Sequence, residues 1–165
     1  MARIADTAIL RQLLIFVALP LAYLISGRLG LLLAIPPGYA TAIFVPAGIA
    51  VTATFLAGAI TLAPIFAGSF LLNIWIGYAI TDQLSYASFA SALSIAIAST
   101  LQAAVGGTIL RRYIGYPAPL DAPQDLIFFL ALSPAVCLTS ATISIASLWA
   151  LGVVQSPGLV SNWLS

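Results

Sequence analysis

Three long stretches of this sequence carry no acidic or basic side chain: residues 29–81, 83–110 and 126–165. Crossing a hydrocarbon core of about 30 Å takes roughly 20 apolar residues as a helix. The first stretch is therefore long enough for two crossings, and each of the others for at least one. A soluble domain has about 25% charged residues on average, whereas this chain has 5%. The chain is predicted to be an integral membrane protein.

The apolar segments are typical of helices and not of membrane β-strands. Strands of a membrane barrel alternate polar and apolar residues over about ten positions, and runs such as 13–19 and 29–35 do not alternate. Prolines, glycines and charged residues divide the chain into predicted spans at about 9–26, 40–58, 62–80, 86–110 and 125–153, with the start of a further element at 159–165. We therefore expect an all-α bundle of about five transmembrane helices, forming a single domain over residues 1–165.

The arginines predict an orientation for this bundle. With five spans, Arg3, Arg11, Arg111 and Arg112 share one side of the membrane, and only Arg28 lies on the other. Cytoplasmic ends of spans carry an excess of basic residues. The N-terminus is therefore predicted to be cytoplasmic.

Pro46-Ala47-Gly48 falls inside the predicted second span and is expected to break it, because proline removes a helical hydrogen-bond donor. In transporters, broken helices expose backbone groups that bind substrates and ions. A simple kink satisfied by neighbouring helices is the alternative interpretation of Pro46 and Gly48.

Two amides, Asn73 and Gln102, lie within apolar runs. Each should face protein or a cavity, since an unsatisfied amide in hydrocarbon costs several kcal/mol. A rise of about 1.5 Å per residue puts Gln102 at a depth near that of Thr139 and Ser140. One interpretation is a polar ligand pocket among Gln102, Thr100, Thr139 and Ser140. The other is hydrogen bonding between helices that only fixes their packing.

Small residues recur every fourth position along the predicted fourth span, and every third or fourth position along the fifth. In lipid, such rows let helix backbones approach closely and associate. The two spans are therefore predicted to form the centre of the bundle. The row in the fifth span comprises Ser133, Cys137, Ser140, Ser144 and Ser147.

Several classes of function are disfavoured by composition. The chain has no His and one Cys, Cys137, so the common His- and Cys-based metal sites and a disulfide framework are not expected. A net charge of +1 gives no electrostatic case for nucleic acid. No catalytic constellation is visible, and we expect no enzyme. No cofactor is predicted, while a bound lipid or pigment stays open.

Four segments of the sequence form a recognisable set. The most specific is Pro36–Ala50, with the sequence PPGYATAIFVPAGIA. The weaker ones are Gly68–Asn73, Thr100–Ala103 with the following Leu110–Arg112, and Ser161–Leu164. Together they resemble one family, the first type of bacterial membrane-associated sensor domain. The resemblance extends over about residues 8–165.

This resemblance implies an input module of the bacterial cytoplasmic membrane, usually of about eight spans, joined to a histidine kinase or a cyclic-di-GMP enzyme. It implies no common ligand. Two departures stand out: Gln102 occupies a position where the family commonly has Glu, and the sequence ends where further spans and an output domain are expected. We expect either a fragment or a shortened relative that works as a separate subunit.

Three functions follow from these observations. The first is a sensory input module acting on a cytoplasmic signalling enzyme. The second is a structural or accessory subunit held by its helix faces among other membrane protein chains. The third is a solute-binding transport subunit that uses the broken second span. All three place the chain in contact with the lipid bilayer.

Overall fold

The computed structural model describes residues 2–32, 44–115, 123–150 and 152. This part of the chain is helical and contains no strand, which confirms the predicted all-α class. The helices are α1 (Ala2–Leu31), α2 (Val45–Ala57), α3 (Leu62–Thr81), α4 (Tyr86–Tyr113) and α5 (Pro123–Ala150), with a short 3-10 helix, η1 (Gly58–Thr61), between α2 and α3. The predicted further element at 159–165 lies outside the described residues.

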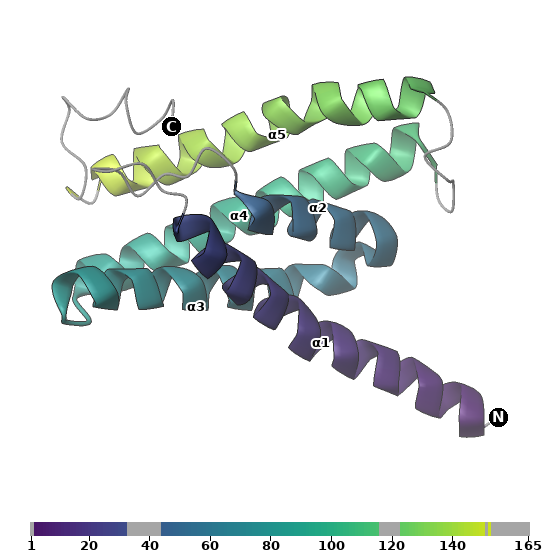
Figure 1. Ribbon diagram of the computed structural model, residues 1–165, viewed down its shortest axis with the longest axis horizontal. Helices are drawn as coiled ribbons and strands as arrows, with labels where there is room; N and C mark the ends of the chain where they lie inside the picture. Colours follow the sequence, from purple (N-terminus) through teal and green to yellow (C-terminus); the bar gives the residue numbers. More distant parts are fainter. Residues whose placement is uncertain (1, 33–43, 116–122, 151, 153–165) are drawn as a thin grey trace.

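Four segments of the described chain are long and apolar enough to cross a membrane, and not the five that the sequence predicted. One of them, Val45–Ala79, joins α2, η1 and α3, yet the chain reverses direction at η1 (Figure 1). With 13 residues, α2 is about 20 Å long, which is shorter than the hydrocarbon core. Helix α2 is therefore too short to form a complete span by itself.

The predicted break at Pro46–Gly48 does not interrupt a helix in the described residues. Helix α2 begins at Val45, so Pro46 lies in its first turn, where a missing backbone N–H breaks no helical hydrogen bond. Residues 40–43 of the predicted span lie outside the described part. The irregular backbone instead follows α2 at Gly58, whose φ of +79° favours glycine.

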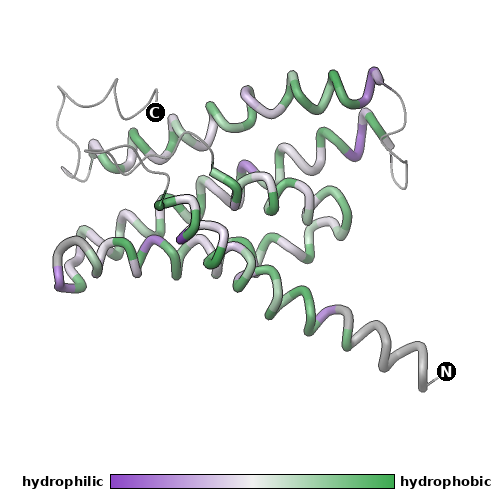
Figure 2. The backbone as a smooth tube through the Cα atoms, viewed as in Figure 1, coloured by the Kyte–Doolittle hydropathy of each residue, from purple (hydrophilic) through white to green (hydrophobic). Residues whose placement is uncertain are grey.

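Local signals in the sequence account for the turn between α3 and α4. Helix α3 ends at Thr81, and the next residue, Asp82, has left-handed backbone geometry. The N–H of Asp82 donates to the carbonyl of Tyr78 at 2.8 Å. Helix α4 begins after Ser85, whose hydroxyl accepts a hydrogen bond from the backbone N–H of Ser88 at 3.1 Å. Hydrophilic residues gather mostly near the ends of the helices, as a membrane-spanning bundle requires (Figure 2).

Helix α4 lies at the centre of the described bundle and packs against α2, α3 and α5. Its glycines allow the closest approach: a Cβ on Gly107 would lie 2.7 Å from the side chain of Thr54 on α2. The prediction that the fifth span is also central is wrong within the described chain. Helix α5 packs extensively on α4 and on no other described helix, and Val136 is its one buried residue.

The end of α4 is fastened to the end of α2 by Arg111. Its Nε donates to the backbone carbonyl of Phe55 at 2.5 Å, and its Nη2 donates to the carbonyl of Leu56 at 3.0 Å. These carbonyls belong to the last turn of α2, where helical partners are missing. Figure 1 shows the start of α1, η1, the end of α4 and the start of α5 at the same end of the bundle. A cytoplasmic location for that end stays a prediction.

Candidate functional site

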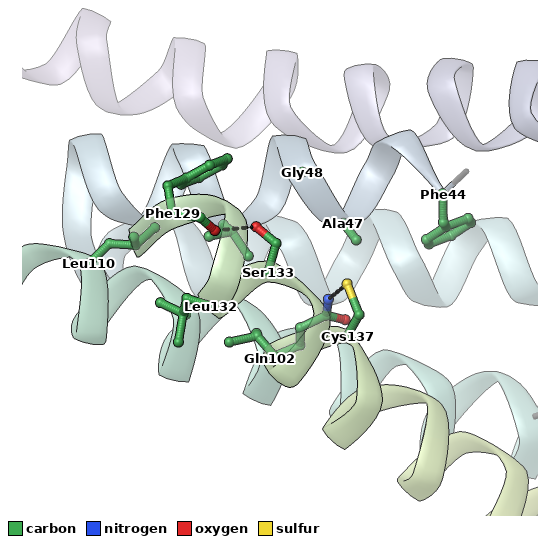
Figure 3. A pocket seen from close by; sticks show the side chains of 12 residues that line it. Phe44, Ala47, Gly48, Gln102, Leu110, Phe129, Leu132, Ser133 and Cys137 are labelled. Carbon is green, nitrogen blue, oxygen red and sulfur yellow. Dashed lines mark hydrogen bonds between the residues drawn. The ribbon is translucent and has the colours of Figure 1, made fainter. Parts of the chain in front are cut away.

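A cavity of about 120 Å³ lies between α2, α4 and α5 (Figure 3). We call it the α2–α4–α5 cavity. Each helix contributes side chains from one face, because its lining residues are spaced three or four positions apart. The lining consists of Phe44, Ala47, Gly48 and Val51 at α2, Gln102, Gly106 and Leu110 on α4, and Phe129, Leu132, Ser133, Val136 and Cys137 on α5.

Two glycines have opposite roles at this cavity. A Cβ on Gly106 would lie 3.1 Å from Val136 and 3.2 Å from Val51, so this glycine lets α2 and α5 approach α4. A Cβ on Gly48 would meet no atom within 4 Å. The missing side chain at Gly48 therefore leaves space open, whereas the missing side chain at Gly106 permits close packing.

The main polar group of the cavity is the amide of Gln102, a side chain that is only 7% exposed. Its Nε2 donates to the Cys137 sulfur at 3.4 Å, and a thiol is a weak acceptor. Within the described chain, its Oε1 accepts no hydrogen bond. A buried amide that makes one weak bond keeps most of its hydrogen-bonding capacity for another partner.

A second polar group comes from α5. The hydroxyl of Ser133 donates to the carbonyl of Phe129 at 2.8 Å, so its oxygen can still accept a hydrogen bond. Among the described residues, the Cys137 thiol is the one ionisable side chain that lines the cavity. The described residues contain no group of three side chains that could hold a metal ion. This arrangement can bind a neutral molecule.

Of the residues predicted to form a polar pocket, only Gln102 lines the cavity. The hydroxyls of Thr100 and Thr139 donate to backbone carbonyls of their own helices, each at 2.7 Å. Ser140 is half-buried on α5, about one turn beyond Cys137. The structure therefore does not bring Thr100, Thr139 and Ser140 together with Gln102.

The other amide, Asn73, lies on α3 and donates to the carbonyl of Ser69 in its own helix at 2.8 Å. It does not contribute to the cavity. From the Pro46–Gly48 motif, Gly48 lines the cavity, while Pro46 is buried in the first turn of α2.

Sequence reasoning missed Cys137 as the hydrogen-bond partner of Gln102 and Ser133 as a second polar residue of the cavity. Both belong to the row of small residues recognised in the fifth span, so the signal was present. Counting depth along a helix locates a residue along the membrane normal but not around the helix axis. The face that α5 turns toward α4 was therefore not determined.

The sequence matches the MASE1 family over residues 13–165. Comparison with curated proteins and with solved structures finds no match. The family match covers nearly the whole chain, confirms the resemblance seen in the sequence, and agrees with the apolar helices of the structure. This chain therefore belongs to MASE1, a family of bacterial membrane-associated sensor domains.

Proposed function

We propose that this chain is a sensory input module of the bacterial cytoplasmic membrane that regulates a histidine kinase or a cyclic-di-GMP enzyme. The family match over residues 13–165 carries this proposal, because MASE1 is a sensory domain found in both classes of enzyme. The output domain belongs either to a partner protein or to the same polypeptide. The chain itself performs no catalysis.

Packing around α4 supports a role in which helices change their arrangement. The α2–α4–α5 cavity leaves α2 and α5 incompletely packed against each other. Helix α5 has one principal neighbour, so its position depends on a single interface. A signal can shift such a bundle only if it has different affinities for two arrangements.

An accessory subunit of a larger membrane complex is the second candidate, and the outer face of α5 favours it. Leu126, Ile127 and Leu130 are 51%, 66% and 60% exposed in the described chain. This face is apolar enough to contact either lipid or another membrane protein.

Co-purification from native membranes in a mild detergent separates the two candidates. Mass spectrometry should identify a histidine kinase or a cyclic-di-GMP enzyme, present in a fixed ratio or as part of the same polypeptide. A complex of other membrane proteins in fixed stoichiometry, without any signalling enzyme, would contradict the sensory role and support the accessory role.

A further inference from the structure

We propose that the α2–α4–α5 cavity binds a small neutral molecule that is mostly apolar and carries one hydroxyl group, which hydrogen-bonds to Gln102. The inference deepens the proposed function by naming the class of ligand, and it rests on that function only for the claim that binding is a signal. Binding itself can be measured without any output enzyme.

The volume of the cavity limits the size of the ligand. An apolar cavity of about 150 Å³ inside a protein holds benzene. At about 120 Å³, this cavity fits a ligand of similar or slightly smaller size, which means one small ring or a short branched chain.

The lining determines the charge and polarity of the ligand. Phe129, Leu132 and Val136 on α5 face the cavity together with Phe44 and Val51, so most of the ligand must be apolar. The described lining contains no acidic or basic side chain that could compensate a charge, and an unpaired charge at membrane depth is costly. The ligand is therefore neutral.

The Gln102 amide selects a hydroxyl. A hydroxyl can donate to Oε1 and accept from Nε2, and both atoms belong to a side chain that is 7% exposed. The only competing bond from the described chain is the 3.4 Å contact of Nε2 with the Cys137 sulfur. In Figure 3 the Gln102 side chain extends from α4 toward Cys137, so a bound hydroxyl would lie where α4 meets α5.

The position of the cavity suggests how occupancy acts on the bundle. A ligand there contacts α2, α4 and α5 at once, whereas α5 otherwise packs mainly on α4. Occupancy therefore adds contacts between α2 and α5 and favours the arrangement in which the three helices are close.

Cys137 is the single cysteine of the chain, it is exposed, and it lines the cavity, so we use its alkylation to report on occupancy. The test uses the full chain in a mild detergent, N-ethylmaleimide as the alkylating reagent, and mass spectrometry of the modified protein. The probes are phenol and fluorobenzene, which have nearly the same size but differ in the hydroxyl. At ten times its half-saturating concentration, phenol should slow alkylation about tenfold. Fluorobenzene at the same concentration should slow it clearly less.

Three variants locate the effect. Gly48→Leu places a side chain into the open space and should abolish protection by phenol, while Gly48→Ala adds one methyl group and should retain it. Gln102→Leu should leave phenol and fluorobenzene equally protective, because the apolar contacts remain and the amide is gone. If Gly48→Leu does not fold, the comparison of Gln102→Leu with the wild type still tests whether the Gln102 amide binds the hydroxyl of phenol.

Equal protection by phenol and fluorobenzene in the wild type would overturn the proposal, as would undiminished protection in Gly48→Leu. Protection that depends on added phospholipid and not on phenol would also overturn it and would assign the cavity to an acyl chain. Failure of the binding test leaves the sensory function to be judged by co-purification. A bound probe without any signalling enzyme would instead contradict the sensory function alone.

Discussion

Helices α4 and α5 have the same length, 28 residues, and similar rows of small side chains, yet they occupy different places in the bundle. Nine residues of α4 are buried, from Ala92 to Leu110, whereas α5 buries only Val136. Helix α4 contacts three helices and α5 chiefly one. Small residues therefore allow close packing, but they do not determine how many neighbours a helix has.

The two helices differ in what lies between their small residues. On α4, Gly106 faces α2 and α5 while the adjacent Gly107 faces α2, so consecutive positions serve neighbouring interfaces. On α5, large side chains such as Ile127 and Leu130 are exposed and do not pack against the rest of the described bundle. A helix with small residues on several faces becomes central, and one with large apolar residues on its outer face is suited to the periphery or to lipid.

The largest effect is expected when a side chain is added to the central helix. Gly107→Leu would place a Cβ 2.7 Å from Thr54 and 3.1 Å from the backbone nitrogen of Phe55, so α4 and α2 must separate. We expect a loss of about 3 kcal/mol in the free energy of unfolding. The matched variant on α5 is Ala131→Leu, at an exposed position, which should change stability by less than about 0.5 kcal/mol. Unfolding in detergent, followed by circular dichroism, measures both, and equal losses would refute the contrast.

The next effect concerns the attachment of α4 to α2. Arg111→Gln removes the charge-assisted hydrogen bonds to the carbonyls of Phe55 and Leu56 and should cost about 1–2 kcal/mol. Arg112→Gln is the control, since Arg112 is exposed and the substitution removes the same charge. It should be nearly neutral in the same unfolding measurement. If both variants behaved alike, net charge and not the hydrogen bonds would be responsible.

The smallest effect is expected at the interface of α3 and α4. The hydroxyl of Ser69 donates to that of Ser99 at 3.2 Å, and both side chains are buried. Ser99→Ala should cost about 0.6 kcal/mol, the average for side-chain hydrogen bonds between membrane helices. A double-mutant cycle with Ser69→Ala measures the coupling, and a coupling energy of zero would show that the bond contributes nothing to stability.

Helix positions could be predicted from the sequence because their ends carry strong local signals. Asp82 and Ser85 mark the turn between α3 and α4, and Arg111 and Arg112 mark the end of α4. The position of α2 was harder to predict. Pro46 is equally compatible with a break inside a helix and with the first turn of one. Only the tertiary arrangement, in which α2 packs on α4 and the chain reverses at Gly58, decides between them.

The candidate site was predicted only in part, for a geometrical reason. The apolar surroundings of Gln102 required a polar partner or a cavity, and the structure provides both. Its partner on α5 was expected at Thr139 or Ser140, at the correct depth to within about one turn. The rotation of α5 about its axis depends on its contact with α4, which no local pattern specifies. Cys137 and Ser133 therefore became visible as site residues only in the folded bundle.

The most direct test of the sensory role measures the activity of the signalling enzyme when a substitution fills the α2–α4–α5 cavity. The signalling enzyme that co-purifies with the chain is assayed for cyclic-di-GMP turnover or autophosphorylation with wild type, Gly48→Leu and Ala131→Leu. Gly48→Leu, which places a side chain into the α2–α4–α5 cavity, should change the activity several-fold, while Ala131→Leu at an exposed position of α5 should leave it unchanged. Identical activity for Gly48→Leu and the wild type would contradict the claim that the cavity regulates the signalling enzyme.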